Sequence, residues 1–182
     1  MGHIELFIIT FLLASNFLGF TLSTNILLKN KIIEPVITFT LINAGMFALG
    51  WGLSYLIKPT LGSFDTMIFP VILFFVGVKI LFRAFTVTDA NRVNEIVHIV
   101  EAVGFAFAMG VNSMIIGLGL GFVSDYLFLS LGLIEVNTLV LSALGIVVRM
   151  KKGCALGGKP IEIISGVSFL VLGILSFFEI YF

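Results

Sequence analysis

Two asparagines lie inside the most apolar stretches of the chain, where their side chains could bind an ion or a polar solute. Asn16 stands in the segment SNFLGFTL and Asn112 in VNSMIIGLGL, at matching points of the two halves. An amide in hydrocarbon is costly unless it has a partner, a water cavity or a ligand. The alternative interpretation is hydrogen bonding between helices, which contributes roughly 0.6–2 kcal/mol per group. These two residues are therefore the first candidates for a functional site.

Four further polar residues in apolar segments are candidates for the same site. Asn43 lies in the segment LINAGMF, and Glu101 precedes Asn112 by eleven residues, or three helical turns on one face. Glu135 lies within LGLIEVNTL, and Glu162 opens the last apolar segment. Each carboxylate could carry a cation or a proton through a membrane, or could be an acid held between helices or at a helix N-terminus.

The other reactive residue types form no catalytic or metal-binding pattern. The chain has a single cysteine and two histidines without metal-site spacing, and no paired aspartates or serine–histidine arrangement. We expect neither an enzyme nor a bound cofactor.

The composition places these residues in a membrane. The chain has 182 residues, of which 59% are hydrophobic and 11% charged, with a mean hydropathy of +1.21. Soluble proteins have about 25% charged residues. The formal net charge is zero, and nothing indicates nucleic acid binding. The sequence predicts an integral membrane protein whose first partner is the lipid bilayer.

The apolar runs predict an all-α protein with a single membrane domain, residues 1–182. A run of about 20 apolar residues satisfies every backbone group in lipid only as a helix, and period-2 alternation is absent. The connection 86–98 is less apolar, and Asp89 could cap an amphipathic surface helix there. The six predicted spans are 4–28, 36–57, 66–84, 99–123, 126–148 and 161–181.

The basic residues predict the orientation in the membrane. Eight of the ten lie in or beside the connections after the first, third and fifth spans, whereas Lys58 lies on the other side. By the positive-inside rule these three connections are cytoplasmic and both termini are outside. Lys79 lies within the third span and can extend towards the cytoplasmic surface. We expect the cell membrane of a prokaryote.

The two halves of the chain predict an internal repeat. A shift of 96 residues lays Asn16 on Asn112 and Gly77 on Gly173. Three spans per repeat, 1–85 and 99–182, is an odd number, so the second copy enters the membrane from the opposite face. Inverted repeats of this kind are a transporter architecture, with the site near mid-membrane where the halves meet.

Four sequence motifs resemble those of the MntP-type manganese efflux pumps, within the LysE-like exporter superfamily. That family carries S-x-D-A in its first span, an acidic or amide residue before P-L-x-G-W-G in its second, S-x-D-A before G-x-G-L in its fourth, and A-E-x-x-G-G in its last. This chain has ASNFLGFT, NAGMFALGWG, GVNSMIIGLGLGF and PIEIISG in those places. The matches are Gly50-Trp51-Gly52, Gly117-x-Gly119-Leu120 and Glu162.

The departures from these motifs bear on the cargo. The two family aspartates, which the resemblance implies are metal ligands, fall on Asn16 and Asn112, and the polar position of the second span falls on Asn43. Mn²⁺ prefers carboxylate, carbonyl and water ligands, so losing two negative charges weakens its binding by several kcal/mol. Asparagine in place of aspartate at both positions therefore favours a different cargo or a loss of transport, unless other acidic residues supply the negative charge.

The resemblance implies a Mn²⁺ exporter that works by alternating access, with manganese as the transported ion. We keep two alternatives. One is a transport-deficient homologue that acts as a structural or interaction subunit of a membrane complex, and the other is a carrier of a neutral or amphipathic solute. A homodimer or a membrane-complex partner is compatible with each of them.

Overall fold

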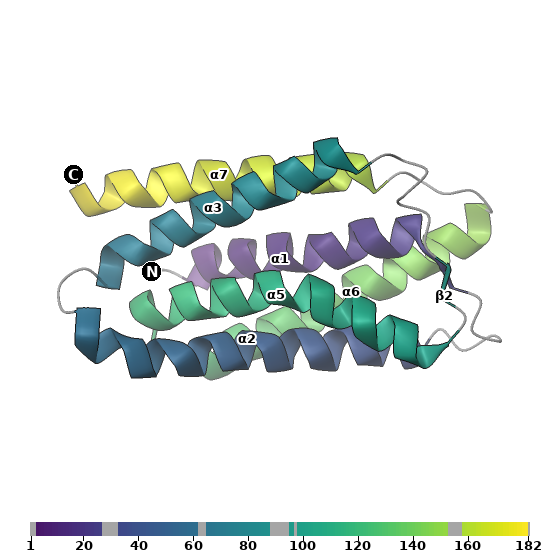
Figure 1. Cartoon of the computed structure of the whole chain (residues 1–182), viewed down its shortest axis with the longest axis horizontal. Coiled ribbons are helices and arrows are strands. Elements are labelled where there is room, and N and C mark those ends of the chain that lie inside the picture. Colours follow the sequence, from purple (N-terminus) through teal and green to yellow (C-terminus); the bar gives the residue numbers. More distant parts are fainter. Residues whose placement is uncertain are drawn as a thin grey trace.

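The computed structural model describes residues 3–26, 33–61, 65–87, 95–96, 98–152 and 158–181 of the chain. Its long helices lie side by side in one bundle (Figure 1). Six of them are long and apolar enough to cross a membrane, which confirms the predicted all-α class. Their bounds are α1 His3–Ser23, α2 Ile33–Leu61, α3 Asp65–Thr86, α5 Ile99–Val123, α6 Leu127–Lys152 and α7 Lys159–Tyr181.

The helix ends follow local chemistry. Five helices begin and end within four residues of the predicted spans. Pro35 lies in the first turn of α2, where a missing N–H costs least. Pro59 lies two residues beyond the predicted span 36–57, but in the structure it is inside the last turn of α2. Only two residues follow it in the helix, so few hydrogen bonds are lost there.

The predicted first span is too long. α1 ends at Ser23, and Thr24 then donates its hydroxyl to the carbonyl oxygen of Phe20 at 2.8 Å. The next two residues form the strand β1, Asn25–Ile26, which pairs in parallel with β2, Glu95–Ile96. Residues 27 and 28 lie outside the described residues.

The same strand pair corrects the helix that was expected in the connection 86–98. Glu95–Ile96 are extended, because their backbone groups pair with β1 instead of within a helix. Most of this connection, Asp89 included, lies outside the described residues. The backbone N–H of His98 donates to Oε2 of Glu101 at 3.2 Å, so α5 begins with an acid that satisfies a backbone group.

Three helix pairs make the closest contacts: α2 with α5, α1 with α6, and α3 with α7. Glycine permits the approach in each. A Cβ atom at Gly50 would overlap the carbonyl oxygen of Met114, and one at Gly117 would overlap that of Phe47. A Cβ at Gly173 would lie 2.8 Å from the backbone nitrogen of Phe74. Small residues at helix contacts are the usual way to bring backbones together in a membrane.

The helices alternate in direction along the chain, and both marked ends lie at the same end of the bundle (Figure 1). α1, α3 and α6 run one way, and α2, α5 and α7 run the other. α1 and α5, which begin the two halves, are therefore antiparallel.

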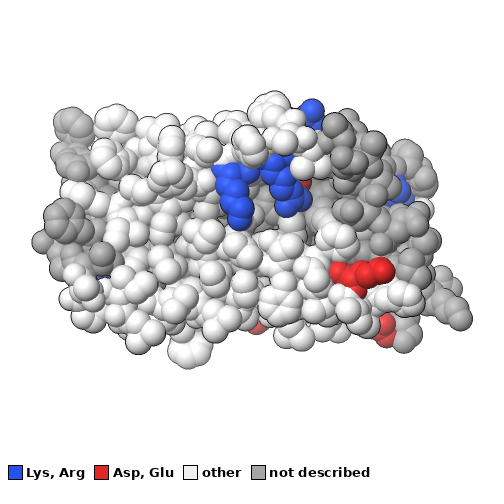
Figure 2. Space-filling model, in the orientation of Figure 1, with Lys and Arg blue, Asp and Glu red and all other residues white. Residues whose placement is uncertain are grey.

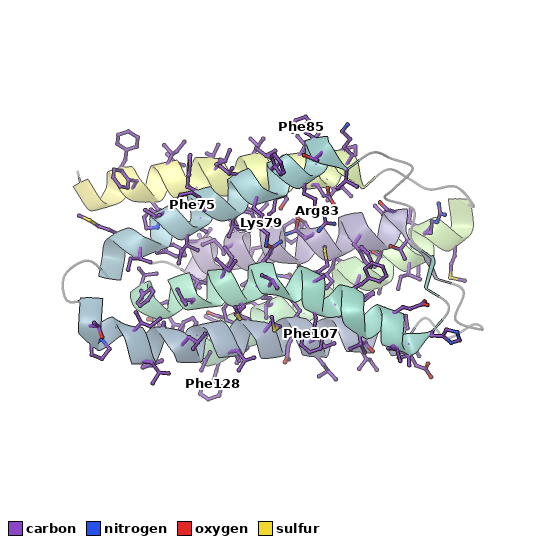
Figure 3. The ribbon with its side chains drawn as sticks, in the orientation of Figure 1. Phe75, Lys79, Arg83, Phe85, Phe107 and Phe128 are labelled. Carbon is purple, nitrogen blue, oxygen red and sulfur yellow. The ribbon has the colours of Figure 1, made fainter. Side chains whose placement is uncertain are left out.

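Aromatic side chains are divided between the core and the outer surface. Trp51 is buried and packs against Phe47 with ring centroids 5.9 Å apart, so it is a core residue and not an interfacial anchor. Phe75, Phe107 and Phe128 are exposed, and in Figure 3 the side chain of Phe128 projects beyond the ribbons below α2. An exterior covered by such side chains suits contact with lipid.

Candidate functional site

A small cavity lies where α1 and α3 meet α5 and α7. Its volume is about 40 Å³, which is room for about three waters or one small ion. Both halves of the chain contribute to its wall. The lining residues are Asn16, Lys79, Ile80, Arg83, Ala108, Asn112 and Glu162.

The two asparagines of the apolar segments both line this cavity. Asn16 comes from α1 and Asn112 from α5, and their exposed fractions are only 4% and 6%. Nδ2 of Asn16 donates to the carbonyl oxygen of Leu13 at 3.3 Å, within its own helix. The matched positions of the two halves thus converge at one place.

A lysine from α3 reaches one of these amides. Nζ of Lys79 donates to Oδ1 of Asn112 at 2.8 Å. An ammonium group only donates, so the partner atom must be the amide oxygen and not the amide nitrogen. This contact fixes the orientation of the Asn112 amide and links α3 to α5.

An ion pair closes the other side of the cavity. Nη2 of Arg83 lies 2.9 Å from Oε1 of Glu162, and Nη1 of Arg83 lies 3.0 Å from the sulfur of Met109. Glu162 is buried in the first turn of α7, whereas the Arg83 side chain is 43% exposed. The pair joins α3 to α7, and it compensates the charge of a carboxylate that would be costly to bury alone.

The lining carries more positive than negative charge. Lys79 and Arg83 contribute two positive charges and Glu162 one negative charge, which sum to +1. In Figure 2 basic side chains gather in the middle of a face that is otherwise largely uncharged, and Figure 3 shows Lys79 and Arg83 at this place, between α3 and α5. Two unit charges 4 Å apart interact by about 4 kcal/mol at an effective dielectric constant of 20. Such a wall disfavours a divalent cation.

Asn43 does not line the cavity but belongs to a second polar cluster beside it. Its side chain is fully buried on α2. Its Nδ2 donates to Oγ1 of Thr138 at 2.7 Å, and its Oδ1 accepts a hydrogen bond from the hydroxyl of Ser113. We call these three residues, Asn43, Ser113 and Thr138, the amide–hydroxyl cluster; it joins α2, α5 and α6.

Two of the three candidate acids also lie away from the cavity. Glu101 is exposed at the start of α5, where it accepts the His98 N–H. Glu135 is exposed on α6 and is not among the lining residues. Glu162 is the only candidate acid in the cavity wall. In the described part of the chain, no three His, Cys, Asp or Glu side chains are grouped so that they could hold a metal ion.

Sequence reasoning missed the roles of Lys79 and Arg83. It used them to orient the chain in the membrane, although their spacing of four residues places both on one face of α3. A basic residue inside an apolar span is a functional candidate in its own right. That signal was present in the segment VGVKILFR.

The helices and the cavity together define a class of protein. The chain is a multi-pass α-helical membrane protein, with a charged cavity built from both of its halves. Buried polar sites between such helices are where membrane transporters bind their cargo.

Comparison with known families then gives the particular assignment. Residues 27–177 match the family described as "Putative manganese efflux pump", and the chain belongs to that family. A relative from Crocosphaera subtropica, named "Putative manganese efflux pump MntP", is 27% identical over 146 residues, which are 79% of this chain and 76% of the relative. Another, from Methanocorpusculum labreanum, is 25% identical over 166 residues, 89% of this chain and 88% of the relative. No solved structure matches.

Proposed function

We propose that this protein is an ion transporter that carries its cargo through the cavity by alternating access between two inverted three-helix halves, residues 1–85 and 99–182. One observation carries the proposal. Asn16 and Asn112, which fall on matching positions of the two halves, line one small cavity together with charged side chains. A polar cavity between the halves of a helical bundle is where a transporter must hold its cargo.

The helix packing supports the inverted relation of the halves. The first helix of each half packs on the second helix of the other, α1 on α6 and α5 on α2, and the two third helices, α3 and α7, pack on each other. Exchanging the halves leaves this set of pairs unchanged. A rocking motion of one half against the other would open the cavity to alternate sides.

The cargo suggested by the relatives' names is manganese, and Mn²⁺ export is our first hypothesis for this chain. Glu162 would supply the single carboxylate of the wall, and Asn16 and Asn112 would supply amide oxygens. Oxygen ligands suit Mn²⁺, but the wall holds one carboxylate against two cationic groups. We therefore propose Mn²⁺ as a weakly bound cargo at most. Export also requires the orientation predicted from the basic connections, in the cell membrane of a prokaryote.

Flux into proteoliposomes tests the proposal. The purified chain should move Mn²⁺ or another small ion faster than empty liposomes, and Asn16→Leu combined with Asn112→Leu should remove the flux. Glu135→Gln is the matched control, because Glu135 lies on an exposed face outside the cavity. Flux that survives the double leucine variant would show that the cargo takes another path.

A structural subunit without transport is the second candidate. It is favoured by two contacts that tie helices together across the cavity, Lys79 to Asn112 and Arg83 to Glu162. If folded protein moves no tested ion and copurifies with a stoichiometric membrane partner, this function replaces transport. A larger neutral solute is less favoured, since the cavity holds only about three waters.

A further inference from the structure

The Lys79 ammonium group is the charge of the cavity wall that the described contacts leave uncompensated. Glu162 is paired with Arg83, and the hydrogen-bond partner of Lys79 is the neutral amide of Asn112. An ammonium inside a membrane span needs an anionic partner or water to be stable. The cavity beside it has room for such a partner.

The Asn112 amide lines the cavity with donors as well as an acceptor. Its oxygen accepts a hydrogen bond from Lys79, and its NH₂ group can donate to an anion. A cation at that oxygen would be repelled by the ammonium, which lies 2.8 Å from it. An anion would find the ammonium and the amide N–H groups already in place.

We propose that this cavity is a binding site for a small anionic group, with Lys79 as its main charge and Arg83 and Asn112 as further donors. The inference deepens the proposed function and rests on it for the view that the cavity holds the cargo. Glu162 opposes an anion, but Arg83 offsets that carboxylate at 2.9 Å, which leaves the wall at +1. A volume of about 40 Å³ suits a halide or a single oxoanion group.

The anionic group can come from solution or from a lipid headgroup. Lys79 and Arg83 are exposed on the face between α3 and α5 (Figures 2 and 3). Lys79 lies seven residues before the end of the span Met67–Thr86, or ~10 Å along the helix. A long basic side chain at this depth can reach a headgroup phosphate. Both sources share the same chemistry at the site.

Thermal unfolding of the full chain in nanodiscs of phosphatidylcholine tests the proposal. Chloride is titrated against gluconate, which is too large for the cavity, at constant ionic strength. We expect chloride to raise the unfolding midpoint saturably. Lys79→Gln should weaken the apparent affinity at least tenfold, Lys79→Arg should keep it within threefold, and Lys58→Gln, the same exchange on α2 outside the cavity, should leave it unchanged.

Nanodiscs that contain phosphatidylglycerol distinguish the two sources. If a lipid phosphate occupies the site, phosphatidylglycerol should raise the midpoint and weaken chloride binding relative to phosphatidylcholine, whose phosphate is compensated by its own choline cation, and Lys79→Gln should abolish both effects. If the site takes a free anion, chloride affinity should be the same in both lipids. Either result supports an anionic occupant.

The proposal is overturned if neither chloride nor the anionic lipid changes the midpoint, or if the change is the same in Lys79→Gln and Lys79→Arg. Saturable stabilisation by manganese gluconate without any anion effect would also overturn it. Flux separates this inference from the proposed function. Anion binding without flux would contradict the transport function and support the anion site. Mn²⁺ flux without anion binding would support the transport function and contradict the anion site.

Discussion

Two polar regions of this bundle are built around an asparagine, and they differ in what surrounds the amide. In the amide–hydroxyl cluster, Asn43 is bonded at both ends to hydroxyl groups of neighbouring helices. In the cavity, Asn112 is bonded at its oxygen to an ammonium and lies beside open space. The two regions are adjacent, because Ser113 and Asn112 are consecutive residues of α5 that point about 100° apart.

An amide in a membrane span therefore indicates a binding site only when free space and uncompensated charge lie beside it. Asn43 is fully buried, and its two partners are the neutral hydroxyl groups of Ser113 and Thr138, so it holds α2 against α5 and α6. Asn16 and Asn112 share a volume with charged groups, and there the electrostatics of the wall select the ligand. Three predictions test this division.

The largest expected effect comes from restoring carboxylates in the cavity. Asn16→Asp combined with Asn112→Asp changes the described wall charge from +1 to −1. We expect the affinity for Mn²⁺ to rise at least hundredfold, which is about 3 kcal/mol, because two anionic oxygens then face the cation. Isothermal titration calorimetry on the purified protein measures it.

Asn43→Asp is the matched control for this change. It adds the same carboxylate on α2, but at a fully buried side chain that does not line the cavity. No gain in Mn²⁺ affinity should follow, and stability should fall. A similar gain from Asn43→Asp would contradict the separation of the two regions.

The second prediction concerns the ion pair in the cavity wall. Arg83→Met should lower the free energy of unfolding by about 3 kcal/mol, because it removes the ionic partner of a buried carboxylate. Glu162→Gln added to Arg83→Met should recover much of the loss. Chemical unfolding in bicelles measures the cycle. Equal losses in the single and double variants would show that the charge of Glu162 is held by other groups.

Much of this architecture could be predicted from the sequence. Apolar runs of membrane length predict helices because lipid leaves the backbone no other partner, and the structure confirms six of them. The strand pair Asn25–Ile26 and Glu95–Ile96 could not be predicted, since it depends on two distant connections meeting. Helix ends such as Ser23 are weakly specified for the same reason.

The site was only partly predictable. The sequence singled out Asn16, Asn112 and Glu162, and the structure brings these three to one cavity. It could not show that Asn43 donates to Thr138, since that contact depends on how α2 and α6 are rotated against each other. The tertiary placement of Lys79 beside Asn112 likewise decides the sign of the wall charge.

The smallest expected effect lies in the amide–hydroxyl cluster. Thr138→Val removes the hydroxyl that accepts from Nδ2 of Asn43 but keeps the shape of the side chain. We expect a loss of about 1 kcal/mol in the free energy of unfolding, in the range of interhelical hydrogen bonds in membranes, and Thr138→Ser should lose less. Ion affinity and flux should stay within twofold, because the hydroxyl does not line the cavity. A tenfold loss of flux at unchanged stability would place the cluster on the transport path and dissolve the contrast between the two asparagine sites.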